Sequence, residues 1–439
     1  MKPYYQQGKW SIYFSDCREI LPSLDKASAI VTDPPYELGF MGKSWDSKGV
    51  SFQKETWEII RDSCLSGAML LSFGGTRTFH RIACAIEDAG WEYRDTVMWV
   101  YGSGFPKSRD IGKDMEKLKV GGIKNLEVIG SKQGIKVETG TQGFSYSKEY
   151  VAGKSMGGRQ ISGEIPVYKI DNAWQGYGTA LKPAYEPIIL AMNPLDGTFA
   201  NNALKHGVAG LNIEECRIPS EIIRTIQGQS KSQQSGEMYS GKDQRDKRVF
   251  ENSKGRFPAN FIHDGSQMVM ELFPNSKSSP FKSATTKGHH SIHGTGEFDY
   301  TGGGYVDDGS AARFFYCAKA SKAERDRGCE GLELTQGGSM EANISDVMQL
   351  GGASLKGEHK PRQQTHNNHP TVKPLALMSY LVKLVKMPEY NLVIDPFCGS
   401  GTTLLACIKL GLPCIGIDND EKSCEIAAKR CCQEVMELA

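Results

Sequence analysis

The first hundred residues alternate between short apolar runs and stretches with helical periodicity. Apolar runs of strand length lie at 11–14, 29–31, 68–73 and 95–101. Stretches with apolar residues at helical spacing lie at 16–24, 54–65 and 77–88. Strands that alternate with helices in this way are typical of a parallel sheet with helices on both faces. We therefore expect an α/β fold built on a doubly wound, mostly parallel sheet.

The regular pattern stops after Gly104 and returns only near residue 185. Residues 102–179 are rich in Gly, Ser and Lys and have weak apolar periodicity, which indicates an extended functional insertion. A strand is expected at 185–191, as the last one of the core sheet before a long irregular region. That region, 195–365, holds short patterned pieces separated by polar, Gly-rich spacers.

Near the carboxyl end the pattern is strand, glycine loop, helix and strand. The strands are expected at 391–394 and 414–417, with a helix beginning at Thr402. The loop between them lacks the Gly-Lys-Ser/Thr ending of a P-loop, and its Gly-x-Gly is shorter than a dinucleotide fingerprint. Asp418 follows the second strand, 19 residues after Gly399. A carboxylate at that spacing is placed to accept hydrogen bonds from both ribose hydroxyls of an adenosine-containing cofactor.

The stretch Asp33-Pro34-Pro35-Tyr36 follows an apolar run and so lies at the carboxyl end of an expected strand. In open α/β sheets this is where ligands bind. The two prolines contribute no backbone N–H donors, so the local carbonyls are expected to face outward without partners. With Asp33 they would form a pocket of acceptors, which suits the exocyclic amine of a base, and the Tyr36 ring offers a stacking face. An ordinary capped Pro-Pro turn is the alternative.

Composition and charge set limits on these interpretations. The chain has 439 residues, 39% hydrophobic and 23% charged, with a net charge of +1. This length exceeds what one hydrophobic core usually supports, so an insertion or second domain is expected. Residues 101–170 carry 12 Lys/Arg and 7 Asp/Glu, an excess of +5. That excess suits either a phosphate-facing surface or a solvated basic loop.

Cysteine usage and hydropathy indicate a soluble protein of the cytoplasm. The 12 cysteines include no C-x-x-C pair, which favours free thiols over a disulfide framework. The amino-terminal segment has no apolar signal region, and no run of about 18 apolar residues occurs, so no membrane partner is expected. His289, His290 and His293 lack Cys partners at ligand spacing, so no metal site is expected.

Taken in order, the two motifs resemble the β class of S-adenosylmethionine-dependent DNA amino-methyltransferases. In that class a DPPY-type catalytic motif comes first, a variable recognition region follows, and the cofactor motif comes last. The segment 369–374, His-Pro-Thr-Val-Lys-Pro, matches the HPTxKP element of the family, which helps to hold the methionine end of the cofactor. The resemblance implies a Rossmann-like methyltransferase sheet with a permuted motif order and an inserted recognition region.

The resemblance also implies site residues and segment boundaries. The implied catalytic residues are Asp33, Pro34, Pro35 and Tyr36. The implied residues for S-adenosyl-L-methionine are Thr32, His369, Thr371, Lys373, Asp395, Pro396, Phe397, Gly399, Ser400, Gly401, Thr402 and Asp418. The expected segments are a catalytic half at 1–105, a basic insertion at 106–179, the last core strand at 180–194, a recognition region at 195–365 and a cofactor half at 366–439.

The expected reaction is site-specific methylation of an exocyclic amino group in double-stranded DNA, after the target nucleotide flips into the pocket. In the family, Asp before Pro-Pro-Tyr is commoner among adenine enzymes, which favours N(6)-adenine, with N(4)-cytosine as the alternative. An RNA or protein methyltransferase and an inactive DNA-binding relative are further alternatives. A cognate restriction enzyme and a homodimer are the other partners that the resemblance allows.

Overall fold

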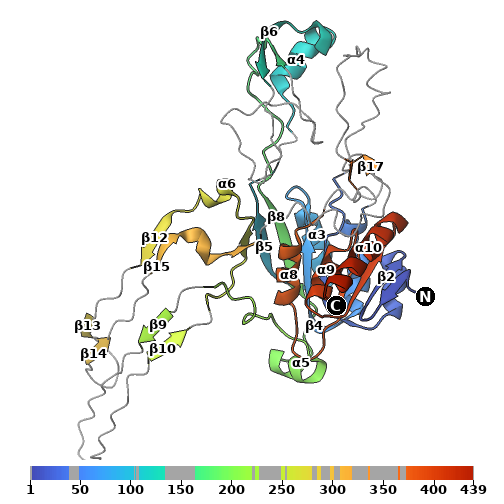
Figure 1. The fold of residues 1–439 in the computed structure, drawn as a ribbon, viewed down its shortest axis with the longest axis vertical. Coiled ribbons are helices and arrows are strands. Elements are labelled where there is room, and N and C mark those ends of the chain that lie inside the picture. The colour runs from blue at the N-terminus through green and yellow to red at the C-terminus, as the bar shows by residue number, and fades with distance from the viewer. Residues whose placement is uncertain are drawn as a thin grey trace, which may run out of the picture. The chain divides into compact units, whose positions relative to one another are not determined.

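The computed structural model describes the larger part of the chain, and the residues described are 2–38, 49–102, 104, 108–133, 164–219, 223–226, 249–252, 255–278, 284–287, 297–300, 307–318, 335–336, 364–365 and 372–438. The chain divides into two compact units, which Figure 1 colours by residue number. The first comprises Met1–Asn212, Asn260–Gln267 and Ala318–Ala439, and the second Ile213–Ala259 and Met268–Cys317. His369, Thr371 and the histidine group 289–293 lie outside the described residues.

A large sheet forms the core of the first unit, with strand order β1-β2-β20-β19-β3-β4-β8-β5-β11. The strands β2, β20, β19, β3 and β4 are mutually parallel, whereas β8 runs antiparallel between β4 and β5. The mostly parallel α/β sheet expected from the sequence is therefore confirmed. The bounds are β1 Tyr5–Gln7, β2 Trp10–Phe14, β3 Ala27–Thr32, β4 Cys64–Phe73, β5 Glu92–Val100, β8 Tyr185–Met192, β11 Phe261–His263, β19 Val393–Asp395 and β20 Cys414–Asp418.

The sheet interleaves the two ends of the chain. From β3 the chain continues to β4 on one side, while from β19 it continues to β20 on the other. The strand order therefore reverses between β3 and β19, and ligands of open α/β sheets bind at the carboxyl ends of the strands at such a reversal. Beyond the strands expected from the sequence, β11 adds to the sheet by pairing parallel with β5.

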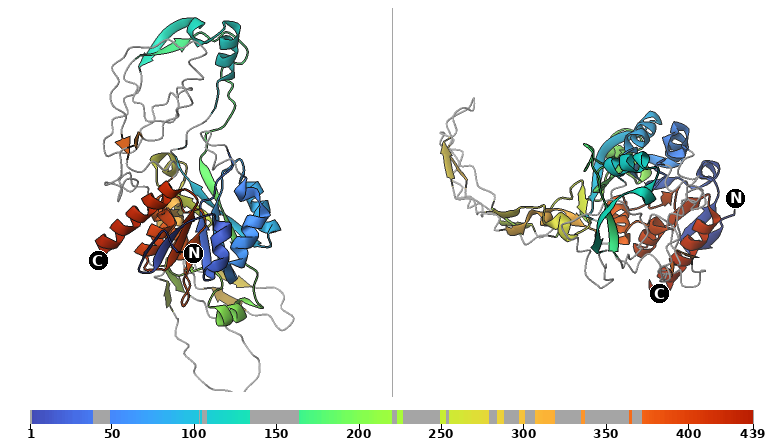
Figure 2. Two further views of the ribbon diagram at one scale, coloured as in Figure 1. Left: turned by 90° about the vertical axis from the view of Figure 1, so that its right-hand side faces the viewer. Right: turned by 90° about the horizontal axis from the view of Figure 1, so that it is seen from above.

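Helices cover both faces of the sheet, and Figure 2 shows the red helices near the carboxyl end on one side and the blue helices on the other. Successive strand residues point to opposite faces, so alternate positions supply two apolar layers. On one face Ile30, Leu70 and Ile189 pack in a buried cluster with Trp57 and Ile82. The helices are α1 Cys17–Ile20, α2 Lys54–Asp62, α3 Phe79–Asp88, α5 Phe199–His206, α8 Leu375–Leu384, α9 Thr402–Lys409 and α10 Glu421–Leu438.

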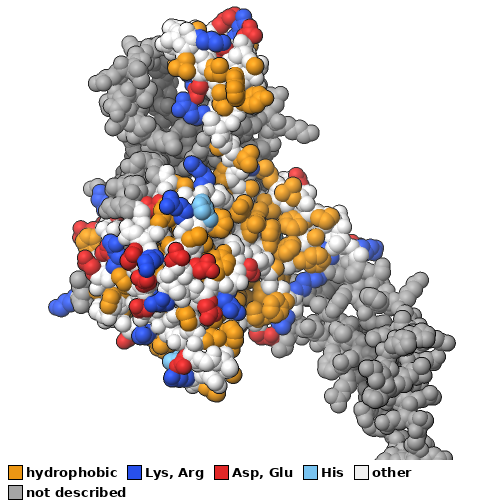
Figure 3. Space-filling view, turned by 180° about the vertical axis from the view of Figure 1, so that it is seen from behind, with side chains coloured by type: hydrophobic (Ala, Val, Ile, Leu, Met, Phe, Trp, Pro, Cys, Tyr) orange, Lys and Arg blue, Asp and Glu red, His pale blue; other side chains and the backbone are white. Residues whose placement is uncertain are grey.

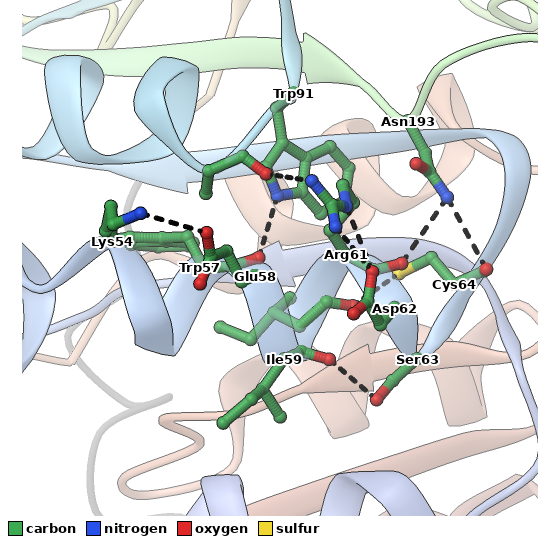
Figure 4. A network of polar contacts seen from close by, with 12 residues as sticks. Lys54, Trp57, Glu58, Ile59, Arg61, Asp62, Ser63, Cys64, Trp91 and Asn193 are labelled. Carbon is green, nitrogen blue, oxygen red and sulfur yellow. Dashed lines mark hydrogen bonds and ion pairs between the residues drawn. The ribbon is translucent and has the colours of Figure 1, made fainter.

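Polar contacts close the edges of this cluster, as Figure 4 shows around α2. The indole nitrogen of Trp91 donates to the Trp57 carbonyl at 3.0 Å. The Asn193 amide, just after β8, donates to the Leu65 carbonyl at 3.0 Å. The first contact joins α2 to the segment before β5, and the second joins the end of β8 to the start of β4.

The insertion contributes a small substructure to the first unit. Helix α4 (Ile111–Lys119) begins at Asp110, whose carboxylate accepts a hydrogen bond from the Lys113 backbone N–H at 2.9 Å. The antiparallel pair β6 (Val128–Gln133) and β7 (Glu164–Tyr168) follows. Four basic residues here form ion pairs with Asp114, Glu116 and Glu127, three of the acidic residues of the same segment. They are Arg109, Lys117, Lys119 and Lys169.

The second unit consists of short antiparallel strand pairs. Strand β9 pairs with β10, β12 with β15, and β13 with β14. The bounds are β9 Ile223–Ile226, β10 Val249–Asn252, β12 Asn275–Ser278, β13 Ala284–Lys287, β14 Glu297–Tyr300, β15 Asp307–Ser310 and β16 Tyr316–Cys317, with helix α6 at Gln267–Met270. In the first unit, β17 (Thr335–Gln336) pairs with β18 (Gln364–Thr365).

The described surface and helices show no feature that would identify a nucleic-acid, membrane or metal partner. On the face drawn in Figure 3, the described acidic and basic side chains are interspersed, and neither sign dominates. Within the described ranges, no helix combines the length and the apolar character that crossing a bilayer requires. Among the same residues, no group of three potential metal ligands lies together.

Candidate functional site

The Asp33–Tyr36 motif follows directly on β3, at the reversal point of the sheet. Both carboxylate oxygens of Asp33 have donors. Oδ1 accepts from the Tyr36 hydroxyl at 2.8 Å, and Oδ2 accepts from the Lys373 ammonium at 2.6 Å. Asp33 of the first motif and Lys373 of the 369–374 segment, 340 positions apart in the sequence, therefore form an ion pair.

The backbone carbonyls of Pro34, Pro35 and Tyr36 were expected to lack hydrogen-bond donors, and this is wrong for Pro35 and Tyr36. The Ser51 hydroxyl donates to the Pro35 carbonyl at 2.7 Å, and the Thr78 hydroxyl donates to the Tyr36 carbonyl at 2.8 Å. These donors come from segments that the local sequence does not place beside the motif. In the part of the chain that the structure describes, the Pro34 carbonyl accepts no hydrogen bond. Of the carbonyls of Pro34, Pro35 and Tyr36, that of Pro34 is thus the one without a donor among the described residues.

Glu186, near the start of β8, is a site residue that the sequence analysis missed. Its carboxylate accepts from the Tyr36 hydroxyl at 3.0 Å and lies 3.3 Å from the Lys373 ammonium. The Lys373 side chain is only 9% exposed, and its ammonium also lies 4.8 Å from the centre of the Phe73 ring. An acidic residue at the start of an otherwise apolar strand was the available signal, because such a side chain needs a partner for its charge.

The two carboxylates of Asp33 and Glu186 keep the Lys373 side chain protonated and positively charged. Burial alone would lower the pKa of the Lys373 ammonium, but the two carboxylates of Asp33 and Glu186 outweigh it, and the pKa lies above its ordinary value. Burial, followed by the same two carboxylates, raises the pKa of Tyr36 well above its usual range. At neutral pH the cluster therefore contains an ammonium and a neutral phenol.

Asp395, the last residue of β19, connects the cofactor loop to the catalytic strand. Its carboxylate accepts from the hydroxyls of Thr32 and Thr403 at 2.6 Å each, and from the Phe397 backbone N–H at 3.2 Å. Burial raises the pKa of Asp395 to about 7, although these three donors oppose the rise. These contacts fix the start of the glycine loop against the end of β3.

The glycine loop that follows has the backbone geometry of a ligand cradle. Gly399 and Gly401 have φ angles of 50° and 77°, in the left-handed region that favours glycine. The Gly399 backbone N–H donates to the Asp418 carboxylate at 2.8 Å. Burial raises the pKa of Asp418 to about 6. Loop and carboxylate thus lie together at the carboxyl ends of β19 and β20.

Arg430 on α10 is a second residue that the sequence analysis missed. Its guanidinium is buried and donates to the Ser400 carbonyl at 2.5 Å, the Ser400 hydroxyl at 3.0 Å and the Thr402 hydroxyl at 3.2 Å. A lone arginine between Ala427 and Cys431, on the apolar side of α10, was the signal. By binding the loop from behind, Arg430 holds Ser400 and Thr402 in place.

Most of the described cofactor residues lie at the end of β19 and in the loop that follows it. Pro396 and Phe397 continue from β19 into the glycine loop, and the Phe397 ring lies 6.5 Å from that of Trp57. A glycine loop, a helix beginning at Thr402 and a partly exposed carboxylate at Asp418 suit a nucleoside-containing cofactor. Lys373, also expected to hold the cofactor, instead has its polar contacts with Asp33, Tyr36 and Glu186.

Comparison with known proteins agrees with this arrangement. The family model N6_N4_Mtase, described as DNA methylase, matches residues 27–429. The type II methyltransferase M.HindIII of Haemophilus influenzae is 45% identical over 62 residues, which is 14% of this chain and 20% of that protein. M2.MboI of Moraxella bovis, also a type II methyltransferase, is 38% identical over 68 residues, or 16% and 24%.

The matched segments span about a quarter or less of the length of these curated relatives. Among solved structures, the PvuII DNA methyltransferase (cytosine-N4-specific) aligns over 98% of this chain and 88% of its own, at 11% identity and a TM-score of 0.42. A likeness of that strength does not bear on function. The family model, by contrast, matches most of the sequence, and the chain therefore belongs to the N6/N4 DNA methylase family.

Proposed function

We propose that the protein transfers a methyl group from S-adenosylmethionine, the methyl donor of its family, to the exocyclic amino group of a base in double-stranded DNA. The observation that carries the proposal is the adjacency of β3 and β19. This adjacency supports the proposal, because Asp33 follows β3 and the glycine loop follows β19, so an amine and a methyl donor would meet at one edge of the sheet. Positioning of this kind is the main source of catalysis in a direct displacement.

The chain's own residues divide the work between the two sides of this site. Asp418 would accept hydrogen bonds from the ribose hydroxyls, while the Gly399–Gly401 backbone approaches the cofactor closely. The cofactor, when bound, supplies an electrophilic methyl group. Asp33 and the Pro34 carbonyl would accept the two amine hydrogens and direct the nitrogen lone pair away from the ring. Tyr36 would stack on the base.

A base inside a duplex cannot reach this site, so the target nucleotide must leave the helix. Extrusion costs a few kcal/mol, which stacking and the two amine hydrogen bonds would offset. We further propose adenine N(6) as the target, because Asp precedes Pro-Pro-Tyr. Cytosine N(4) is the second candidate, since it presents the same amino group to the same two acceptors.

The test is expression in a bacterial host without DNA methyltransferases, followed by single-molecule sequencing of its genomic DNA. Methylated adenines in a fixed short sequence are expected. Methylated cytosines would retain the mechanism and overturn the choice of base. Unmodified DNA together with measurable S-adenosylmethionine binding would contradict the proposal and favour an RNA substrate or an inactive relative. The Asp33→Ala protein, expressed in parallel, controls for modification by the host.

A further inference from the structure

The hydrogen bonds around Tyr36 contain more acceptors than its hydroxyl can serve. The single hydroxyl hydrogen faces Asp33 Oδ1 at 2.8 Å and Glu186 Oε2 at 3.0 Å. The Lys373 ammonium has three hydrogens, and three acceptors lie around it: Asp33 Oδ2 at 2.6 Å, the Tyr36 oxygen at 3.2 Å and Glu186 Oε2 at 3.3 Å. The lysine donors are therefore matched, while the Tyr36 hydrogen has two alternative acceptors.

Both carboxylate oxygens of Asp33 already accept a hydrogen bond, one from Tyr36 and one from Lys373. Each oxygen has two lone pairs, so Asp33 can accept an amine hydrogen beside these donors, but it accepts the amine more strongly when it is shared with fewer of them. A donor that turns away from Asp33 needs another acceptor, because a polar hydrogen without one is costly in a largely buried cluster.

We propose that Glu186 is a positioning residue that takes over the Tyr36 hydroxyl when Asp33 accepts the target amine. Rotation of one O–H bond moves the hydrogen from Asp33 Oδ1 to Glu186 Oε2, and no covalent bond changes. Asp33 Oδ1 is then open for the amine, while Lys373 still holds Oδ2. The inference rests on the proposed methyl transfer and deepens it by assigning a role to a residue outside the catalytic motif.

The surroundings of Glu186 suit an acceptor that stays in place during this exchange. Glu186 pairs with Trp99 across the β5–β8 ladder, and its side chain is 22% exposed. The Lys373 ammonium, 3.3 Å away, gives this partly buried carboxylate a charged partner. The Tyr101 hydroxyl, 3.5 Å away, approaches the other carboxylate oxygen and leaves Oε2 for Tyr36.

The experiment compares Glu186→Gln with the wild-type enzyme under single-turnover conditions. The substrate is an unmethylated oligonucleotide duplex that contains the target sequence identified by the genomic sequencing. The substitution keeps the side-chain shape but exchanges an anionic acceptor for a neutral amide. The rate of methyl transfer should fall roughly tenfold to a hundredfold, the range that one hydrogen bond to a charged group supports. Dissociation constants for S-adenosylmethionine and for the duplex should stay unchanged. Glu92→Gln, an exposed position on β5, is the matched control and should keep the wild-type rate.

A double-mutant cycle separates this role from a merely structural one. In the Tyr36→Phe background the ring remains but the hydroxyl is gone, so Glu186→Gln should slow transfer much less than it slows the wild-type enzyme. Equal factors in both backgrounds, or an unchanged rate in Glu186→Gln, would overturn the inference. A wild-type protein that methylates no DNA would instead remove the proposed function, which the first experiment decides independently.

Discussion

The Thr32 hydroxyl donates a hydrogen bond to Asp395 at 2.6 Å, and the two residues end adjacent parallel strands. Thr32 directly precedes Asp33, the proposed amine acceptor, whereas Asp395 opens the glycine loop. One short contact therefore sets the distance between the proposed amine acceptors and the proposed cofactor cradle. Since that distance decides whether two reactants are held within reach, the predictions below centre on this pair of strand ends.

Replacing Asp33 should separate chemistry from cofactor binding. Asp33→Ala removes an amine acceptor and should abolish methyl transfer, while S-adenosylmethionine still binds in an isothermal titration. Asp25→Ala, an exposed position before β3, is the matched control and should retain activity. Full activity in Asp33→Ala would remove the proposed mechanism.

Replacing Asp418 should have the opposite effect. Asp418→Ala removes the proposed partner of the ribose hydroxyls, so the dissociation constant for S-adenosylmethionine should rise by roughly tenfold to a hundredfold. The transfer rate at saturating cofactor should change less than the affinity. Glu425→Ala, exposed on α10, provides the comparison. If Asp418→Ala binds the cofactor as tightly as the wild type, its assignment to the ribose is wrong.

The glycine loop can be tested with two glycines of similar backbone conformation. A Cβ at Gly401 would lie 2.8 Å from the Ala427 Cβ, whereas a Cβ at Gly411 would meet nothing within 4 Å. Their φ angles are 77° and 70°. Gly411→Ala should cost about 1–2 kcal/mol for the left-handed backbone alone. Gly401→Ala should cost more, as denaturant unfolding would show, and should also weaken cofactor binding; equal losses would argue against a tight loop.

The buried Asp395 carboxyl should make stability depend on pH. Its pKa is about 7 in the folded protein, against an ordinary value of 3.8, because burial disfavours the charged form. The folded state keeps this proton to higher pH than the unfolded chain, so the stabilisation is complete below about pH 4 and is lost as the pH rises through 7. Asp395→Asn should flatten this decline in the free energy of unfolding. An unchanged slope would show that the group does not titrate in this range.

The sequence predicted the parts of the site whose signals are local. Strand ends at Thr32 and Asp395 follow from apolar runs, and the Gly399–Gly401 turn follows from its glycines. The partners of those parts were not predictable in the same way. Glu186 and Arg430 reach the site only through the sheet order and the packing of α10, which no short window of sequence contains.

The donors that occupy the Pro35 and Tyr36 carbonyls show the same limitation. Ser51 and Thr78 lie 16 and 42 residues from their acceptors, and no residue of the motif itself predicts these contacts. The antiparallel β8 was likewise expected as a strand but not as one inserted between β4 and β5. Local chemistry thus indicated the reaction, while the tertiary fold determined which acceptors are open to a substrate.

The pairing of β3 with β19 also constrains how the protein is made. Thr32 and Asp395 are 363 positions apart, so the ribosome releases β3 about 20 to 70 s before its neighbour at ordinary rates of elongation. During that interval one side of β3 has an unpaired edge, which is prone to association with other chains. Nascent chains should therefore need a chaperone until the last strands emerge, and the yield of active protein should depend on chaperone supply more than the stability of the finished fold suggests.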